Sequence, residues 1–362
     1  MGRSHDAAGE GSTAEGRESW RPEADPPWTS PLERPREPEQ EVGLRPSRLE
    51  DFVGQERVVS NLRVALDAAL ARGEAPDHLL LAGPPGLGKT SLARILATEL
   101  GTHLHGTTGP ALERPRDLVG ILTQLRPGDV LFVDEIHRVP SAVEEYLYSA
   151  MEDFSIEFTL GEGPAARVVP LRLERFTLVG ATTREGLLSA PFRARFGLVE
   201  RLVPYPTDDL VRIIERAAGL LRIGLGQGAA VLLAERSRGT PRIAGRYLRR
   251  ARDLAAVAGR TSIDADLAAD AMARLGVDPQ GLDDVDRRIL AYLGRNPSTP
   301  IGLKTLAAAI GESEDTIEEV FEPHLLRMGL LHRTARGRLV TPEGCRAVGI
   351  DPRGAAPGPE LF

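Results

Sequence analysis

The sequence predicts an α/β domain with a mostly parallel sheet, then a small helical domain and a C-terminal winged helix. Short apolar runs alternate with helical patterns over residues 44–206, which is typical of parallel strands covered by helices. After Pro206 the patterns are helical and amphipathic, and beyond Gly281 three helical patterns precede a short arginine-rich ribbon. We therefore divide the chain into a tail, three domains and a flexible end: residues 1–41, 42–206, 207–281, 282–350 and 351–362.

The N-terminal tail is acidic and rich in proline, with ten acidic and five basic side chains in residues 1–41. It has almost no aliphatic residues, so it cannot bury enough apolar surface to offset the entropy of ordering, and we expect disorder. Trp20 and Trp28 are either a docking motif or incidental aromatics. The tail carries −5 of the net charge of −7, so the overall charge says little about nucleic-acid binding.

The α/β domain is expected to begin with an amphipathic helix at residues 55–71. Three clear buried strands are expected after it, at residues 79–81, 130–133 and 176–180. One segment departs from the alternation of strands and helices. Residues 154–160 alternate apolar and polar side chains, GEGP follows as a turn, and residues 167–173 form a second strand-like run. This inserted β-hairpin is either an ordinary edge hairpin or a projection that binds a partner.

The segment LLLAGPPGLGKTS at residues 79–91 joins an apolar run to a helix through a glycine-proline loop. It fits G-x-x-x-x-G-K-[ST], in which backbone N–H groups cradle phosphates, the lysine neutralises them and the threonine hydroxyl holds Mg²⁺. Glycine lets the backbone approach the phosphates, and the following helix directs its positive end toward them. The motif predicts a site for ATP and Mg²⁺ that includes Gly83, Gly86, Gly88, Lys89, Thr90 and Ser91.

A second apolar strand ends in two carboxylates, in the segment DVLFVDEIH at residues 129–137. We assign Asp134, with Thr90, to the Mg²⁺ shell and Glu135 to the attacking water, which together predict an ATP hydrolase. His137 is expected to support or pack against its neighbours rather than to act as a base. Cys345 is the single cysteine, no Cys/His cluster has metal-ligand spacing, and no apolar run reaches the roughly 18 to 20 residues that span a bilayer. We therefore expect a cytoplasmic protein without a further metal.

Five motifs together resemble the RuvB family, bacterial AAA+ motors that drive branch migration of Holliday junctions: GPPGLGKT, DEIHR at 134–138, GEGPAAR at 161–167, GATTR at 180–184 and RGTPRIA at 238–244. GPPGLGKT alone indicates AAA+ ATPases in general, whereas GEGPAAR with DEIHR and a C-terminal winged helix is more specific. The resemblance covers residues 44–350.

The resemblance implies roles for further residues. Thr183 matches sensor 1, Arg195 matches the arginine finger that enters a neighbouring subunit's site, and Arg242 matches sensor 2. With Lys89 and Glu135, the first two complete the expected catalytic set. Three more positions match residues near the nucleotide: Leu44, Arg45 and Tyr205. The tyrosine is expected to stack on the base or flank it.

The resemblance also implies partners. The family forms a homohexameric ring on duplex DNA and works with a RuvA-type junction-binding tetramer and a RuvC-type resolvase, in recombination, repair and the SOS response. In the family, the hairpin at residues 154–173 docks on RuvA, and Arg333 and Arg338 match the DNA-contacting pair. Arginines on a ribbon suit phosphate contacts, which give affinity without sequence information.

Two other functions share some of these features. A clamp-loader-like switch uses the same sensors and finger, but the C-terminal winged helix argues against it. A regulatory DNA-binding protein would use ATP to gate oligomerisation and the winged helix to read a sequence. Such a regulator should prefer one duplex sequence by about 4 to 10 kcal/mol, whereas a motor should bind many sequences alike with a steep salt dependence.

Overall fold

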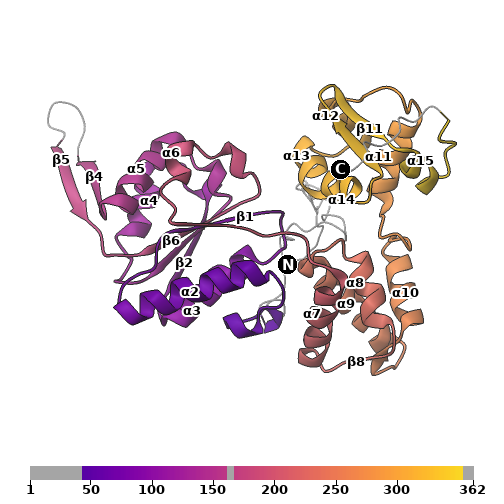
Figure 1. Cartoon of the computed structure of the whole chain (residues 1–362), viewed down its shortest axis with the longest axis horizontal. Helices are drawn as coiled ribbons and strands as arrows, with labels where there is room; N and C mark the ends of the chain where they lie inside the picture. The colour runs from indigo at the N-terminus through magenta and orange to yellow at the C-terminus, as the bar shows by residue number, and fades with distance from the viewer. Residues whose placement is uncertain (1–42, 161–166, 354–362) are drawn as a thin grey trace, which may run out of the picture.

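The computed structural model describes residues 43–160 and 167–353. Figure 1 shows the α/β domain in indigo to magenta on one side, with the helical domain and the yellow winged helix on the other. The expected tail at residues 1–41, the GEGP turn and residues 354–362 lie outside the described residues. Within the described residues, no helix is both long and apolar enough to cross a membrane.

A parallel five-stranded sheet forms the centre of the α/β domain, in the order β2-β3-β6-β1-β7. Its strands are β1 (Leu79–Ala82), β2 (Leu104–Thr108), β3 (Val130–Asp134), β6 (Thr177–Thr182) and β7 (Leu198–Arg201). In the ladder between β1 and β6, Ala82 pairs with Thr182. Because parallel strands present their carboxyl ends at one edge, the loops after β1, β3 and β6 lie together there.

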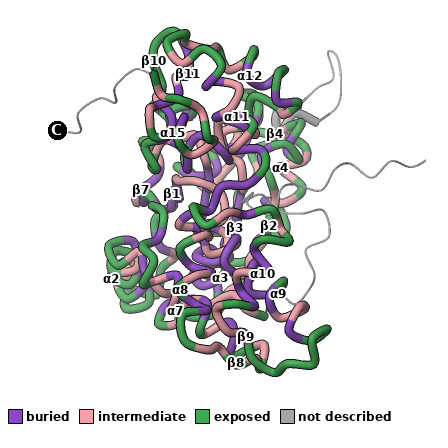
Figure 2. The backbone as a smooth tube through the Cα atoms, turned by 90° about the vertical axis from the view of Figure 1, so that its right-hand side faces the viewer, coloured by how far each residue is buried: buried purple, intermediate pink, exposed green. Residues whose placement is uncertain are grey.

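Helices cover both faces of this sheet: α2 (Glu56–Arg72), α3 (Lys89–Leu100), α4 (Pro115–Leu122), α5 (Ser141–Glu152) and α6 (Ala190–Arg193). Successive residues of a strand point to opposite faces, so Leu79 and Leu81 pack with α2 and α3 while Leu80 packs with α4 and α5. This explains why β1 reads as a continuous apolar run. Figure 2 shows β1 and β3 as buried segments in the interior.

The inserted hairpin consists of β4 (Ser155–Leu160) and β5 (Arg167–Arg172), paired antiparallel, and it projects from the α/β domain in Figure 1. The base of its apolar face is anchored in the core rather than exposed. Ile156 is buried, and Phe154 packs against Phe176 with 5.9 Å between ring centroids. Val169, on β5, is 40% exposed.

The helical domain contains four helices and one short parallel strand pair: α7 (Thr207–Leu220), α8 (Ala229–Arg236), α9 (Pro241–Val257), α10 (Ala265–Arg274), β8 (Gly224–Leu225) and β9 (Ser262–Ile263). Apolar residues of α7 and α9, such as Ile214 and Ile243, belong to the same buried cluster as the α2 and α3 residues of the α/β domain. The two domains therefore share a core.

The winged helix has its own core and comprises α11 (Asp284–Gly294), α12 (Leu303–Ile310), α13 (Glu314–Thr316), the π-helical turn η6 (Ile317–Phe321), α14 (Glu322–Arg327), β10 (Leu331–Thr334), β11 (Gly337–Val340) and α15 (Pro342–Ala347). The third helical pattern that the sequence predicts before the ribbon, at residues 314–328, is not one continuous α-helix. Pro323 has no N–H to donate to the carbonyl four residues earlier, and the helix widens into η6 before it.

Candidate ATPase active site

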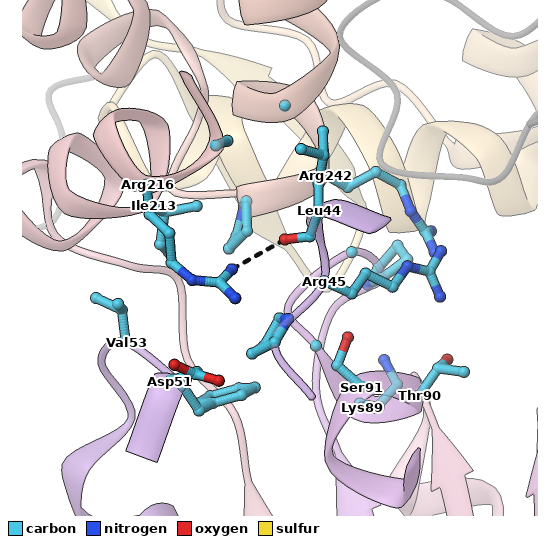
Figure 3. Close-up of a pocket in the computed structure, with 18 of the residues that line it drawn as sticks. Leu44, Arg45, Asp51, Val53, Lys89, Thr90, Ser91, Ile213, Arg216 and Arg242 are labelled. Atoms are coloured by element: carbon cyan, nitrogen blue, oxygen red, sulfur yellow. Dashed lines mark hydrogen bonds between the residues drawn. The ribbon is translucent and has the colours of Figure 1, made fainter. Parts of the chain in front are cut away.

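A pocket lies between the α/β domain and the helical domain, at the carboxyl ends of β1, β3 and β6 (Figure 3). It brings together many of the residues expected to bind or hydrolyse ATP: Leu44, Arg45, Gly86, Gly88, Lys89, Thr90, Ser91, Asp134, Glu135, Thr183 and Arg242. The first ten come from the α/β domain, and Arg242 comes from the first turn of α9. The site is therefore built from two domains.

The P-loop presents the first turn of α3 to this pocket. Gly88 precedes the helix with φ of +109°, a conformation that favours glycine, and a Cβ there would lie 3.0 Å from the ring of Phe52. The ammonium group of Lys89 donates to the carbonyls of Gly83 at 2.7 Å and Pro84 at 2.9 Å. Burial lowers the pKa of Lys89 to about 8, so at neutral pH it remains mainly charged in a pocket that suits an anion.

The two carboxylates lie at the end of β3, where Asp134 is the last residue of the strand and Glu135 directly follows in a tight backbone turn. The N–H of Glu135 donates to the side chain of Asp134 at 3.0 Å, and Glu135 has φ of +51°. Gly109 lies directly against this turn, because a Cβ there would come within 2.3 Å of the Glu135 carbonyl oxygen. Burial, and secondarily the charge of Asp134, raise the pKa of Glu135. A carboxylate with a raised pKa is a better acceptor for a proton of water.

The segment after β6 places a hydroxyl in the pocket. Thr183 lines the pocket, and its Oγ1 is buried without a hydrogen-bond partner among the described residues. The preceding Thr182 Oγ1 lies 3.0 Å from His137 Nδ1 and accepts the N–H of Arg184 at 3.0 Å. Burial lowers the pKa of His137, which therefore stays neutral near pH 7 and supports β6.

Several pocket residues were not expected from the sequence: Pro46, Asp51, Phe52, Val53, Ile213, Arg216, Ala217, Gly245 and Arg249. Arg216, on α7, donates to the Leu44 carbonyl at 3.0 Å, the dashed line in Figure 3. The spacing of Ile213, Arg216 and Ala217 places them on one face of α7. That spacing could have indicated a shared face, but only the docking of α7 shows that this face closes the pocket.

Comparison with protein families accounts for all three domains. A model described as the Holliday junction DNA helicase RuvB P-loop domain matches residues 44–202. Models of the RuvB AAA lid domain and the RuvB C-terminal winged helix domain match residues 205–278 and 279–349. The chain belongs to the RuvB family.

Individual relatives agree. Proteins from Chlorobium phaeobacteroides and Prosthecochloris aestuarii, both named Holliday junction branch migration complex subunit RuvB, are each 55% identical to this chain, over 302 and 319 residues. These matches cover 83% and 88% of this chain and 87% and 92% of the relatives. A solved Thermotoga maritima RuvB, titled a Holliday junction branch migration motor, is 48% identical with a TM-score of 0.78, covering 85% of this chain and 99% of that one. The expected family, fold class and ATP hydrolase activity are confirmed.

Tyr205 contacts the P-loop of this RuvB chain, and its expected position beside the base stays a prediction. Tyr205 is not one of the residues that line the pocket, but it contacts the loop that carries Gly86 and Gly88. It is 6% exposed, and its hydroxyl donates to the Leu87 carbonyl at 3.1 Å. A Cβ on Gly88 would lie 3.9 Å from this hydroxyl. Tyr205 therefore supports the P-loop from beneath, a contact that the sequence did not indicate.

Arg195 lies outside the pocket of its own chain, in the segment between α6 and β7. Its guanidinium stacks over the ring of Tyr148 at 4.5 Å from the centroid and lies 3.0 Å from Glu152. The guanidinium of Arg195 also donates a hydrogen bond to the Pro191 carbonyl at 2.9 Å. The side chain is 29% exposed, so part of it can be reached from outside the chain.

The predicted DNA-contacting pair of the winged helix is only partly exposed. Arg333 and Arg338 face each other across β10 and β11, and both pair with Glu322, which is fully buried. The Arg338 side chain is 11% exposed, whereas that of Arg333 is 46% exposed. The guanidinium of Arg338 compensates the buried carboxylate of Glu322, and the DNA contact expected for this pair stays a prediction. Arg336, at the turn of the ribbon, is exposed.

Proposed function

We propose that this chain is the ATP-driven motor subunit that moves Holliday junctions along duplex DNA, working as a homohexameric ring. The observation that carries the proposal is the pocket between two domains, because Arg242 of the helical domain faces it together with Lys89, Glu135 and Thr183. A change at the nucleotide can therefore be transmitted to the helical domain as a movement. The names of the relatives support branch migration as the work done.

Within the pocket each group has a role set by its chemistry. Lys89 neutralises the outer phosphates, Glu135 accepts a proton from the attacking water, and Thr183 orients that water. The hydroxyl of Thr90 and the carboxylate of Asp134 are oxygen ligands of the type that Mg²⁺ prefers, and Mg²⁺ bound with a nucleotide commonly uses one or two protein ligands. When bound there, Mg²⁺ would neutralise charge on the phosphates.

The arginine finger requires a second subunit. Arg195 is absent from the pocket of its own chain and partly exposed, which suits an arginine that completes the site of a neighbour. A finger of this kind stabilises the charge that develops on the transferred phosphoryl group. The same reasoning favours a closed ring, in which every site receives a finger.

The remaining partners follow from family membership. We infer that the projecting hairpin β4–β5 docks on a RuvA-type tetramer, that a RuvC-type resolvase joins a larger complex, and that the protein acts in the cytoplasm. Val169, exposed on β5, is an apolar side chain available for such docking. Recombination, DNA repair and the SOS response are the processes concerned.

Duplex binding separates this motor from a sequence-reading regulator. We expect unrelated duplexes to bind alike, and Arg336→Ala to weaken all of them by a similar factor and to lower the salt slope by about one. Anisotropy titrations at several salt concentrations measure both effects. Arg274→Ala, which removes an exposed arginine from α10, is the matched control and should change neither. A preference of about 10³-fold or more for one sequence would instead favour the regulator.

A further inference from the structure

Arg184 joins the edge of the ATP pocket to the winged helix. It directly follows Thr183, and its guanidinium contacts three carboxylates of the winged helix. The distances are 2.7 Å to Asp315, 2.7 Å to Glu319 and 3.4 Å to Glu318. These residues lie more than 100 positions further along the chain. With Glu322 they form a group that we call the acidic turn, defined as Asp315, Glu318, Glu319 and Glu322.

The contact is more enclosed than an ordinary surface ion pair. The side chain of Arg184 is 28% exposed and that of Glu319 is 18% exposed. Isolated exposed pairs contribute little to stability, whereas an arginine whose planar fork meets several carboxylates is fixed in orientation. Burial raises the pKa of Glu319, Arg184 opposes this shift, and the charge of Glu135 adds to it. The winged helix therefore places a carboxyl within electrostatic reach of the catalytic carboxylate.

Arg184 is also tied to the pocket through its backbone. Its N–H donates to Thr182 Oγ1 at 3.0 Å, and Thr182 Oγ1 lies 3.0 Å from His137. Thr183 lies between the two tied residues and has its buried hydroxyl in the pocket. A displacement of the Arg184 side chain would thus act on the segment that positions this hydroxyl.

The acidic turn serves the DNA-binding ribbon as well. Glu318 lies 3.3 Å from Arg333, and Glu322 pairs with both Arg333 and Arg338. Glu318 therefore links the two sets of ion pairs, because it contacts both Arg184 and Arg333 of the ribbon. The ion pairs form one contiguous network between the ATP pocket and the surface proposed to bind DNA.

We propose that Arg184 is a positioning residue for ATP hydrolysis, which the acidic turn holds in place while the winged helix is docked. Hydrolysis then depends on the position of the DNA-binding domain within the same subunit. The inference rests on ATP hydrolysis by this chain and not on the ring, the arginine finger or the partner proposed above. It adds a contact between domains to the roles already assigned to Lys89, Glu135 and Thr183.

A double-mutant cycle tests the proposal in the full chain, with Arg184→Gln, Glu319→Gln and the double variant. Each single change should lower kcat for ATP by about tenfold, because small displacements of a positioned group cost rate, and should leave KM almost unchanged. The double variant should be no slower than Arg184→Gln, because the Arg184–Glu319 contact that Glu319→Gln removes is already lost in Arg184→Gln. Glu314→Gln is the matched control, since Glu314 is exposed and has no ion pair among the described residues, and it should keep the wild-type kcat.

Two further measurements separate this effect from loss of the fold or of DNA binding. Binding of a fluorescent ATP analogue and of duplex DNA should be unchanged in Glu319→Gln, which removes no contact of Arg333 or Arg338. If Arg184→Gln does not fold, Glu319→Gln decides alone. A wild-type kcat in Glu319→Gln, a double variant whose losses multiply, or a loss confined to KM would overturn the proposal. The wild type and every variant are compared at a protein concentration at which sedimentation shows the same assembly, so that a failed ring, which would contradict the proposed function, is distinguished from a lost Arg184 contact.

Discussion

Glu135→Gln is expected to lower steady-state ATP hydrolysis by about 10² to 10⁴-fold while ATP still binds. The amide keeps the size of the side chain but cannot accept the proton of the attacking water. The contacts of Lys89 with the P-loop carbonyls and the backbone turn against Gly109 do not involve the Glu135 carboxylate, so the binding pocket persists. Phosphate release gives kcat, and titration with a fluorescent ATP analogue gives the affinity.

Glu145→Gln is the matched control for this change. Glu145 is an exposed carboxylate on α5 of the same domain and does not line the pocket, so its loss should leave both measurements at the wild-type value. If Glu135→Gln hydrolysed ATP at the rate of this control, another group would have to activate the water. Loss of nucleotide binding without a loss of kcat would likewise contradict the assignment.

Arg195→Ala is expected to lower hydrolysis by about 10³-fold or more in the assembled protein, which is the usual effect of removing an arginine finger. The affinity for ATP within one subunit should change little, because Arg195 does not line the pocket of its own chain. The rate is measured as phosphate release at a protein concentration at which sedimentation shows assembly. Arg193→Ala, an exposed arginine on the same helix end, provides the comparison and should retain most of the rate.

Mixing Arg195→Ala with Glu135→Gln tests whether the arginine finger acts on the site of a neighbouring subunit or on the site of its own chain. In a mixed assembly, a subunit with Arg195→Ala keeps Glu135, and an adjacent Glu135→Gln subunit supplies an intact Arg195. Some sites are then complete, so the mixture should regain part of the wild-type rate. If Arg195 acted within its own chain, no subunit would hold both groups and the mixture would stay inactive.

Elements with a strong local pattern could be predicted from the sequence. The buried strands β1 and β3 are continuous apolar runs, and the P-loop between β1 and α3 is a contiguous motif. The pocket therefore contains nearly all the residues expected from motifs. By contrast β2, with the sequence LHGTT, and β7 were not anticipated, because their side chains are only partly buried and their pairing with β3 and β1 decides that they are strands.

Contacts between distant segments were the part that sequence could not supply. Tyr205 follows β7, and only the three-dimensional fold brings its hydroxyl within hydrogen-bond distance of the Leu87 carbonyl. The sequence predicts Arg338 as a basic residue of an exposed ribbon, but its side chain is mostly buried because it pairs with the buried carboxylate of Glu322. Nothing in the motif GATTR indicates that Arg184 forms ion pairs with the winged helix. In each case the partner of a charged or polar side chain is set by the packing of distant segments, so the spacing of residues along the chain does not predict it.

Dissociation of a synthetic four-way junction tests the motor assignment most directly. The purified protein is incubated with the junction, ATP and Mg²⁺, with and without a RuvA-type partner, and Glu135→Gln serves as the inactive control. We expect duplex arms to be released only with ATP, faster with the partner, and not by Glu135→Gln. A junction that stays whole while the wild-type protein hydrolyses ATP, in an assay that an active motor passes, would contradict branch migration.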